Sequence, residues 1–154
     1  MNLLLLATPL ACLTLGLSAC ESGGPTAATP PGTVPVTLPD GGVIYAEVVT
    51  TPQKQAQGLM FRPELPPDRG MLFLFTEMSP RPFWMYQTVI PLDMIWLDRE
   101  RRIVEIAAEV PPCPSKEPES CPNYGGNTHS MYVLELAAGQ AAARGLKVGG
   151  QIAF

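Results

Sequence analysis

Proline restricts how this chain can fold more than any other residue type does. The sequence contains 18 prolines, and all of them except Pro9 follow Cys20. Proline lacks a backbone N–H and its ring clashes with the preceding helical turn, so it interrupts long helices and is confined to the edges, ends and bulges of sheets. We therefore expect short strands joined by rigid loops.

The first 20 residues predict export and attachment to lipid. An apolar run from Leu3 to Leu17 is too short to span a bilayer, which takes about 20 residues. It closes with Leu17–Cys20, the small-residue pattern that precedes the lipidated cysteine of bacterial lipoproteins. We predict a signal peptide over residues 1–19 and a diacylglycerol-modified Cys20, and hence an exported protein whose partner is the membrane, facing the periplasm or the cell surface. An uncleaved helix, or cleavage at another position, is the alternative.

The rest of the chain divides into a linker and one domain. Residues 20–33 comprise the lipidated cysteine and a stretch rich in Gly, Pro, Ser and Thr, which is typical of a flexible tether. Residues 34–154 are long enough to close one hydrophobic core. The chain carries 14 acidic and 10 basic residues, a net charge of −4. This balance argues against nucleic acid as a partner, because nucleic-acid binders need clustered positive charge.

The two cysteines that follow Cys20 predict a disulfide. Cys113 and Cys121 flank a short, proline-rich loop. In an oxidising compartment such a pair closes the loop as a disulfide, which contributes roughly 2.5 kcal/mol in the chain-entropy estimate. Metal ligation is the alternative, but no further cysteine or histidine nearby completes a set of four ligands.

Apolar runs and turn signals predict a mainly β domain. Residues 34–38 and 43–49 are β-branched runs around a Pro-Asp-Gly-Gly turn, which is typical of a hairpin. A threonine N-cap, a proline at the first position and a terminal glycine predict a helix over residues 52–57, and an alanine-rich stretch predicts another at 140–144. Further strands are expected at residues 71–75, 83–85, 94–97, 102–110, 130–136 and 151–154. The natural closure is an antiparallel β-sandwich or jelly-roll-like barrel with one or two short helices.

Five ordered blocks of the sequence carry a resemblance to a known family. They are Gln57–Arg62 (QGLMFR), Gly70–Phe75 (GMLFLF), Phe83–Thr88 (FWMYQT), Ile90–Met94 (IPLDM) and Val133–Leu136 (VLEL). Together they resemble the uncharacterised family DUF192 over about residues 34–154. The resemblance implies a compact, jelly-roll-like β fold in proteins that are often exported or tethered, and it implies no established activity. The chain departs from the family at Gln87, where asparagine is usual, and at Gly149-Gly150, where Gly-Asp is typical.

The segment from Phe83 to Asp93 is the best candidate for a ligand site. It combines aromatic residues and methionine with a few polar groups, as small-ligand pockets do. Arg62 is a candidate counter-charge for Asp93, or an anion clamp. The expected ligand-binding residues are Arg62, Trp84, Gln87, Thr88 and Asp93. The alternative is that Trp84 is core, that Asp93 caps a turn and that Arg62 satisfies backbone carbonyls.

Common catalytic motifs are absent from the sequence. There is no Gly-x-Ser-x-Gly elbow, phosphate loop, dinucleotide fingerprint or His-Glu-x-x-His helix, and His129 is the only histidine. A carboxylate pair for glycoside cleavage would have to come from Asp93, Glu105, Glu109 and Glu135. Alternation along 102–110 places Val104, Ile106, Ala108 and Val110 on one face, and Glu105 and Glu109 in solvent on the other. Glu135 is expected to pair with a neighbour.

Copper(I) deserves separate consideration because the chain is rich in methionine. His129 and Met131 place an imidazole and a thioether on one strand face. However, Met60, Met71, Met85 and Met94 lie inside apolar runs, where methionine fills the core. We expect no metal and no cofactor.

Three functions remain as hypotheses. The leading one is a non-catalytic envelope lipoprotein that binds a small molecule, a glycan or an envelope partner. The second is a carboxylate-dependent hydrolase of a cell-envelope polymer, which requires two carboxyl groups about 5 to 10 Å apart across a groove. The third is an assembly module, which requires a contiguous exposed apolar patch.

Overall fold

A computed structural model describes residues 28–154, so the predictions for the signal peptide and for Cys20 fall outside the described residues. The elements follow in the order β1 (Thr33–Thr37), β2 (Val43–Val49), α1 (Pro52–Gln57), β3 (Arg69–Pro80), β4 (Phe83–Trp84), β5 (Leu92–Leu97), β6 (Ile103–Val110), η1 (Pro118–Ser120), β7 (Asn123–Tyr124), β8 (His129–Ala137) and α2 (Gln140–Ala143). Within these residues, no helix has the length and apolar character needed to cross a membrane.

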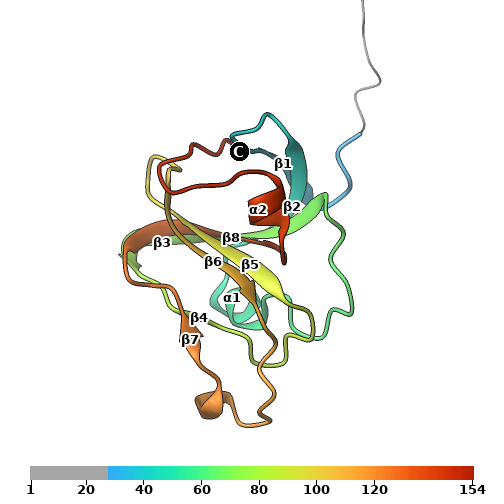
Figure 1. Cartoon of the computed structure of the whole chain (residues 1–154), viewed down its shortest axis with the longest axis vertical. Coiled ribbons are helices and arrows are strands. Elements are labelled where there is room, and N and C mark those ends of the chain that lie inside the picture. Colours follow the sequence, from blue (N-terminus) through green and yellow to red (C-terminus); the bar gives the residue numbers. More distant parts are fainter. Residues whose placement is uncertain (1–27) are drawn as a thin grey trace, which may run out of the picture.

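Six strands form one open sheet in the order β1-β2-β3-β8-β5-β6, and β4 and β7 form a second, two-stranded sheet. All neighbouring strands are antiparallel except β2 and β3, which are parallel and joined by a crossover that contains α1. Figure 1 shows the large sheet in the middle of the molecule, with β4 and β7 below it. The predicted mainly β fold with short helices is confirmed, and the sheet does not close into a barrel.

The helix α1 begins and ends where the sequence predicts. The Thr51 hydroxyl accepts a hydrogen bond from the Lys54 N–H at 3.4 Å, and Pro52 occupies the first turn. Gly58 follows the helix with φ of 49°, a conformation that favours glycine. The predicted hairpin is also present as β1 and β2.

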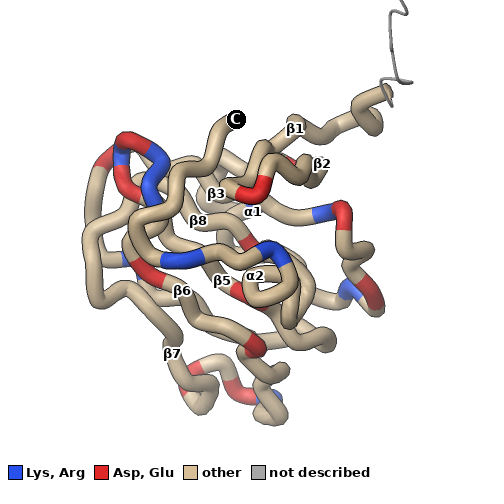
Figure 2. Tube along the Cα trace, turned by 45° about the horizontal axis from the view of Figure 1, so that its top comes forward, with Lys and Arg blue, Asp and Glu red and all other residues tan. Residues whose placement is uncertain are grey.

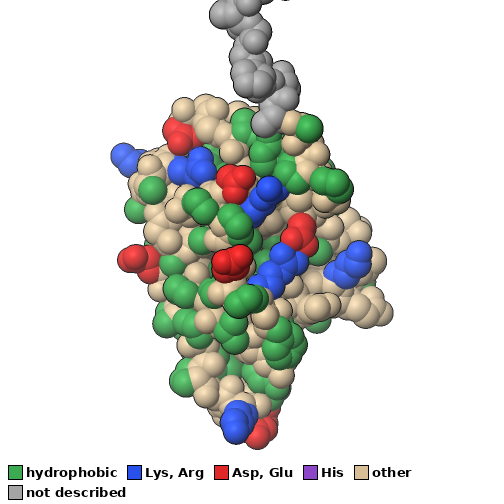
Figure 3. Space-filling view, turned by 90° about the vertical axis from the view of Figure 1, so that its right-hand side faces the viewer, with side chains coloured by type: hydrophobic (Ala, Val, Ile, Leu, Met, Phe, Trp, Pro, Cys, Tyr) green, Lys and Arg blue, Asp and Glu red, His purple; other side chains and the backbone are tan. Residues whose placement is uncertain are grey.

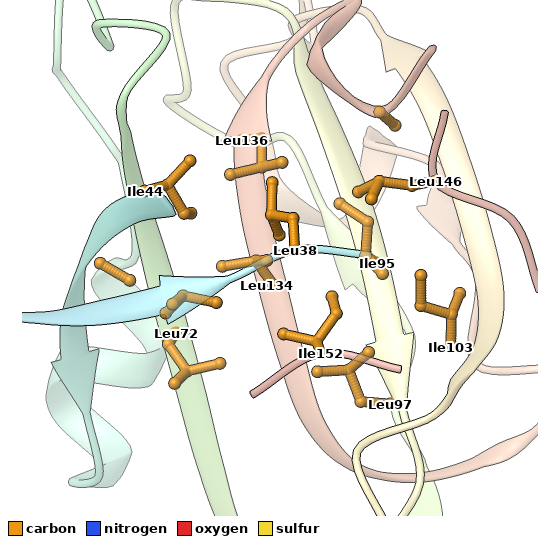
Figure 4. Close-up of a cluster of buried hydrophobic side chains, with 13 residues drawn as sticks. Leu38, Ile44, Leu72, Ile95, Leu97, Ile103, Leu134, Leu136, Leu146 and Ile152 are labelled. Atoms are coloured by element: carbon orange, nitrogen blue, oxygen red, sulfur yellow. The ribbon is translucent and has the colours of Figure 1, made fainter. Parts of the chain in front are cut away.

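The core consists of two clusters on opposite faces of the large sheet. Alternate residues of β3, β5 and β8 point to opposite faces, so these central strands are buried on both sides. The first core cluster, drawn in Figure 4, contains Val36, Leu38, Ile44, Ala46, Leu72, Ile95, Leu97, Ile103, Leu134, Leu136, Ala141, Leu146 and Ile152. The second core cluster contains Val49, Leu59, Met71, Phe73, Met85, Leu92, Met94, Trp96, Val110 and Val133.

Two predictions about edge segments need correction. Strand β6 does not alternate simply, because its pairing with β5 shifts register twice. Val104 therefore packs against the second core cluster, Ile106 packs against the first, and Ala108 is exposed. The predicted strand at 151–154 makes only isolated bridges, to Thr37 and Arg102. The two bridges join the segment to opposite edges of the sheet, near β1 and near β6, so residues 151–154 do not add a strand to either edge.

Trp96 fixes the loops around the small sheet. Its indole Nε1 donates a hydrogen bond to the Arg81 carbonyl at 2.7 Å. Gly125 lies so close to the indole that an added Cβ would be 2.3 Å from the ring, and a Cβ on Gly126 would be 2.5 Å from the Pro82 nitrogen. These contacts seat the loop that carries β7 against the loop that carries β4.

Candidate functional site

The structure separates Asp93 from the other predicted site residues. Asp93 is fully buried on the face of the first core cluster, opposite Leu136 of β8. Its Oδ1 accepts the Glu109 N–H and its Oδ2 accepts the Ala141 N–H, both at 2.7 Å. Asp93 therefore ties the β6 bulge and the first turn of α2 to β5. Its bonds are to distant backbone, not to a turn at Pro91 as the alternative interpretation expected.

Arg62 is paired with Glu47 and not with Asp93. Its Nη1 and Nη2 donate to the two carboxylate oxygens of Glu47 at 2.5 and 2.7 Å. The hydrogen bonds to Arg62 hold the pKa of Glu47 below its usual value, and the same bonds raise the pKa of Arg62. Both side chains are about one-third exposed or more, so this pair contributes little to stability.

Glu135 is a buried acid that the sequence offered only as a possible member of a carboxylate pair and not as a ligand-binding residue. It is 4% exposed in the middle of β8, and its Oε2 is buried without a hydrogen-bond partner among the described residues. Burial raises the pKa of the Glu135 carboxyl to about 8, while the positive charge of Arg62 lowers it. At neutral pH the carboxyl is therefore mainly protonated, and the expected pairing of Glu135 with a neighbouring side chain is absent here.

A row of side chains places Glu135 on the second face. In the strand register, Glu47, Met71, Glu135 and Met94 lie opposite one another on β2, β3, β8 and β5. Both methionines belong to the second core cluster. Uncharged thioether side chains thus flank Glu135 in the sheet. The positive charge of Arg62, which is hydrogen-bonded to Glu47, also acts on Glu135.

The Glu135 carboxyl borders a small cavity, which we call the inner lobe. This lobe has a volume of about 30 Å³ and is lined by the end of α1 and the Gly58–Met60 segment, with Thr88 and Glu135. A Cβ added to Gly58 would lie 3.9 Å from Glu135 Oε2 and 3.5 Å from the Phe73 ring. The absence of a side chain at Gly58 therefore keeps the lobe open, with room for a group about the size of a water molecule.

A larger hollow, the aromatic cleft, adjoins the inner lobe. The cleft has a volume of about 300 Å³. The residues that line both hollows are Gln55, Ala56, Phe73, Phe83 and Trp84. Phe75, Pro80, Arg81 and Pro82 complete the cleft. Trp84 is 39% exposed, so it presents an aromatic surface to solvent at this position.

Arg81 brings a positive charge to the aromatic cleft. Its guanidinium lies over the Phe75 ring, 3.7 Å from the ring centre, and its Nη2 donates to the Glu77 carbonyl at 2.9 Å. Its Nε is buried and has no hydrogen-bond partner in the described part of the chain. Burial lowers the pKa of Arg81, and the nearby charge of Glu77 opposes this shift.

Strained backbone holds the loops beside the inner lobe. Phe61 and Gln87 both have positive φ, 63° and 54°, and the Phe61 N–H donates to the Gln87 carbonyl at 2.9 Å. Such conformations cost free energy and occur often at binding sites. The neighbouring Thr88 is buried and lines the inner lobe, so the predicted residues Trp84 and Thr88 do lie together.

Gln87 faces another hollow, the loop groove. This groove, of about 510 Å³, is lined by Tyr86–Val89 and by Pro112, Cys113, Ser115 and Lys116. The predicted disulfide between Cys113 and Cys121 is present, with an S–S distance of 2.07 Å. The disulfide therefore fixes one wall of the loop groove.

The other sequence candidates do not assemble into a site. Glu105 accepts hydrogen bonds from Asn127 and Thr128, and Glu109 is exposed. Met71, Met85 and Met94 are core residues. Within residues 28–154, no group of three or more His, Cys, Asp or Glu side chains is arranged to hold a metal ion.

The surface of residues 28–154 carries both signs of charge without a concentrated basic region. Figure 2 shows acidic and basic positions interspersed along the loops. On the face shown in Figure 3, hydrophobic side chains lie between charges of both signs. The large hydrophobic residues exposed in the described chain are Val43, Phe61, Trp84, Val89 and Val148.

Comparisons with known proteins agree with the fold. The family DUF192, described as an uncharacterized ACR, matches residues 36–154. A crystal structure of a protein of unknown function from Novosphingobium aromaticivorans DSM 12444 is 37% identical, with a TM-score of 0.69 over 79% of this chain and 85% of that one. A proposed transcription regulator from Sinorhizobium meliloti 1021 is 32% identical, with a TM-score of 0.67 over 77% of this chain and 91% of that one. No curated protein matches.

Proposed function

We propose that this chain, which belongs to the DUF192 family, is an exported, lipid-anchored binding protein that holds a small molecule or glycan in the aromatic cleft, with a polar group of the ligand at Glu135. The observation that carries the proposal is the buried Glu135 Oε2 without a hydrogen-bond partner at the inner lobe. A buried polar atom left unpaired costs roughly 1–3 kcal/mol. A ligand that supplies the missing hydrogen bond recovers part of this free energy.

The lining of the aromatic cleft supports a small ligand. Its volume of about 300 Å³ lies at the lower end of the range for ligand pockets, which are mostly apolar with a few polar groups. Trp84, which is 39% exposed, and Phe83 line the cleft, and aromatic side chains of this kind stack on the apolar face of a sugar ring or on another aromatic ring.

The carboxylate-dependent hydrolase is the weaker candidate. Glycoside cleavage uses two carboxyl groups, and Glu135 is the only acidic residue among those that line the aromatic cleft and the inner lobe. Asp93 has both oxygens engaged by backbone N–H groups on the opposite face of the sheet. We therefore favour binding over catalysis.

The relative from Sinorhizobium meliloti is described as a proposed transcription regulator. Transfer of this role to the present chain has little support. Its net charge is −4, and binding to nucleic acid generally requires clustered lysine and arginine.

The cleft is tested by nuclear magnetic resonance with a panel of small sugars, sugar acids, amines and aromatic fragments. We expect a panel member to shift the Trp84 indole N–H signal and to bind at least tenfold more weakly to Trp84→Ala and to Glu135→Met, which removes the polar group. Glu109→Met, which changes an exposed glutamate in the same way, serves as the matched control. If folded Trp84→Ala and Glu135→Met proteins bind every ligand as the parent does, the cleft is not the binding site.

The anchor rests on the sequence Leu17–Cys20 and has a separate test. We expect the full chain, expressed in a bacterial host, to fractionate with membranes and to yield an acylated N-terminal Cys20 peptide in mass spectrometry. Cys20→Ala is expected to move the protein to the soluble fraction. An intact Met1, or an unmodified Cys20 thiol on soluble protein, would contradict the anchor.

A further inference from the structure

The aromatic cleft and the inner lobe are neighbouring hollows that share five lining residues and differ in chemistry. Gln55, Phe73, Phe83 and Trp84 are among the residues that border both hollows. Arg81 borders the cleft only, and Glu135 borders the lobe only. A ligand that occupies both hollows therefore meets a guanidinium at one end and a buried carboxyl at the other, with aromatic rings between them.

The Arg81 end favours an anion. In residues 28–154 no acidic side chain lies within 4.0 Å of the Arg81 guanidinium, and its buried Nε–H is unpaired, although the charge of Glu77 acts on Arg81 from a greater distance. A carboxylate is the best partner for such a group, because hydrogen bonds between guanidinium and carboxylate are charge-assisted. A cationic ligand would instead be repelled by Arg81.

The Glu135 end favours a hydroxyl group. A protonated carboxyl donates one hydrogen bond and accepts others, and a hydroxyl can do both. The lobe volume of about 30 Å³ admits only a small group. An ammonium group would fit by size, but the positive charge of Arg62 already acts on Glu135 and disfavours a second cation.

Resting on the proposed function of the cleft, we infer that its ligand is a small sugar acid, with its carboxylate at Arg81, the apolar face of its ring on Phe83 and Trp84, and a hydroxyl group at Glu135. A plain aromatic acid would satisfy Arg81 but leave Glu135 unpaired. A neutral sugar would satisfy Glu135 but leave Arg81 unpaired.

Four probes separate these classes: glucuronate, glucose, glucosamine and benzoate, each titrated at pH 6.5 by calorimetry and by the Trp84 indole N–H signal. We expect glucuronate to bind at least tenfold more tightly than each of the others. Arg81→Gln is expected to reduce glucuronate affinity at least tenfold, to about that of glucose. Arg81→Lys keeps the charge and should retain most of the preference, while Arg99→Gln, an exposed arginine, is the control.

The outcomes distinguish this inference from the proposed function. Equal affinities for glucuronate and glucose, or preserved glucuronate preference in folded Arg81→Gln, overturn the sugar-acid inference, and the cleft stays a binding site. If another panel member binds in the cleft and glucuronate does not, the sugar-acid inference is also overturned and the cleft stays a binding site. If no compound of the wider panel binds in the cleft, the proposed function fails and the inference fails with it.

Discussion

Two buried acids on neighbouring strands of this sheet have opposite environments. Asp93 of β5 lies on the face of the first core cluster, where two backbone N–H groups at 2.7 Å occupy its oxygens. Glu135 of β8 lies on the other face, where its Oε2 borders a cavity and has no partner among the described residues. The difference teaches that burial alone does not assign a role to a carboxyl. The available donors decide whether it holds the fold together or remains free for a ligand.

The largest expected effect on stability comes from removing the Asp93 carboxyl, whose two oxygens are both hydrogen-bonded. Asp93→Ala removes the acceptor of the buried Ala141 N–H and of the part-buried Glu109 N–H, and each hydrogen bond to a charged group is worth about 1.5–3 kcal/mol. We expect the free energy of unfolding to fall by roughly 4 kcal/mol in urea denaturation. A loss below about 1 kcal/mol would mean that Asp93 does not act as the structural tie that its contacts indicate.

The second effect is a pH dependence that only Glu135 should produce. Its pKa is about 8 in the folded state and 4.5 as the reference value for an unfolded chain. Between these values the unfolded state ionises and the folded state keeps its proton, so stability falls as pH rises, by at most about 1.4 kcal/mol per pH unit. Below pH 4.5 and above pH 8 this contribution is constant.

We therefore expect the parent protein to lose roughly 2–3 kcal/mol more than Glu135→Gln does between pH 5.5 and 7.5. The measurement is urea denaturation of both proteins across this range. Parallel stability curves for the two proteins would show that the Glu135 carboxyl is not held protonated.

A third comparison uses a glycine near each acid. Gly58→Ala places a methyl group beside Phe73 and Glu135 at a φ of 49°, so we expect a stability loss of about 1–2 kcal/mol and weaker binding of any cleft ligand. Gly139→Ala is the matched control at the start of α2, because its φ is 82° and an added Cβ meets nothing within 4 Å. It should lower stability without changing affinity. Equal affinities for the two variants would disprove a role for the inner lobe in binding.

The smallest expected effect concerns Arg62. Because its pair with Glu47 is partly exposed, Arg62→Gln should cost only about 0.5 kcal/mol. The positive charge of Arg62 lowers the pKa of Glu135, so this variant should raise the Glu135 titration midpoint. A carbon-13 titration of the Glu135 carboxyl measures the shift, and an unchanged midpoint would refute the electrostatic link.

Local signals were sufficient for much of the fold. Thr51, Pro52 and Gly58 predicted the bounds of α1, and the apolar run at 71–75 predicted a strand, which forms part of β3. The same local signals did not predict the order of the strands, the parallel pairing of β2 and β3, or the register shifts in β6. These features depend on contacts between residues distant in the chain, which no local pattern encodes.

The site was predicted only in part, and alternation explains why. Of the five residues predicted to bind a ligand, Trp84 and Thr88 line the inner lobe. Asp93 is close to them in sequence, but it lies between Leu92 and Met94, which both face the second core cluster, so its own side chain must point the other way. Since β5 is apolar on both faces, the sequence alone did not show which face carries the cleft. Glu135 became visible as a site residue only when β8 was placed at the centre of the sheet.

The indole of Trp96 has an implication for how this protein can evolve or be engineered. It belongs to the second core cluster, yet it positions the Arg81 carbonyl and leaves space only for hydrogen at Gly125. If the aromatic cleft binds a ligand as we propose, a mutation at Trp96 would alter binding by displacing Arg81, although the indole does not line the cleft. Selection for stability at Trp96 would then also constrain selection for binding.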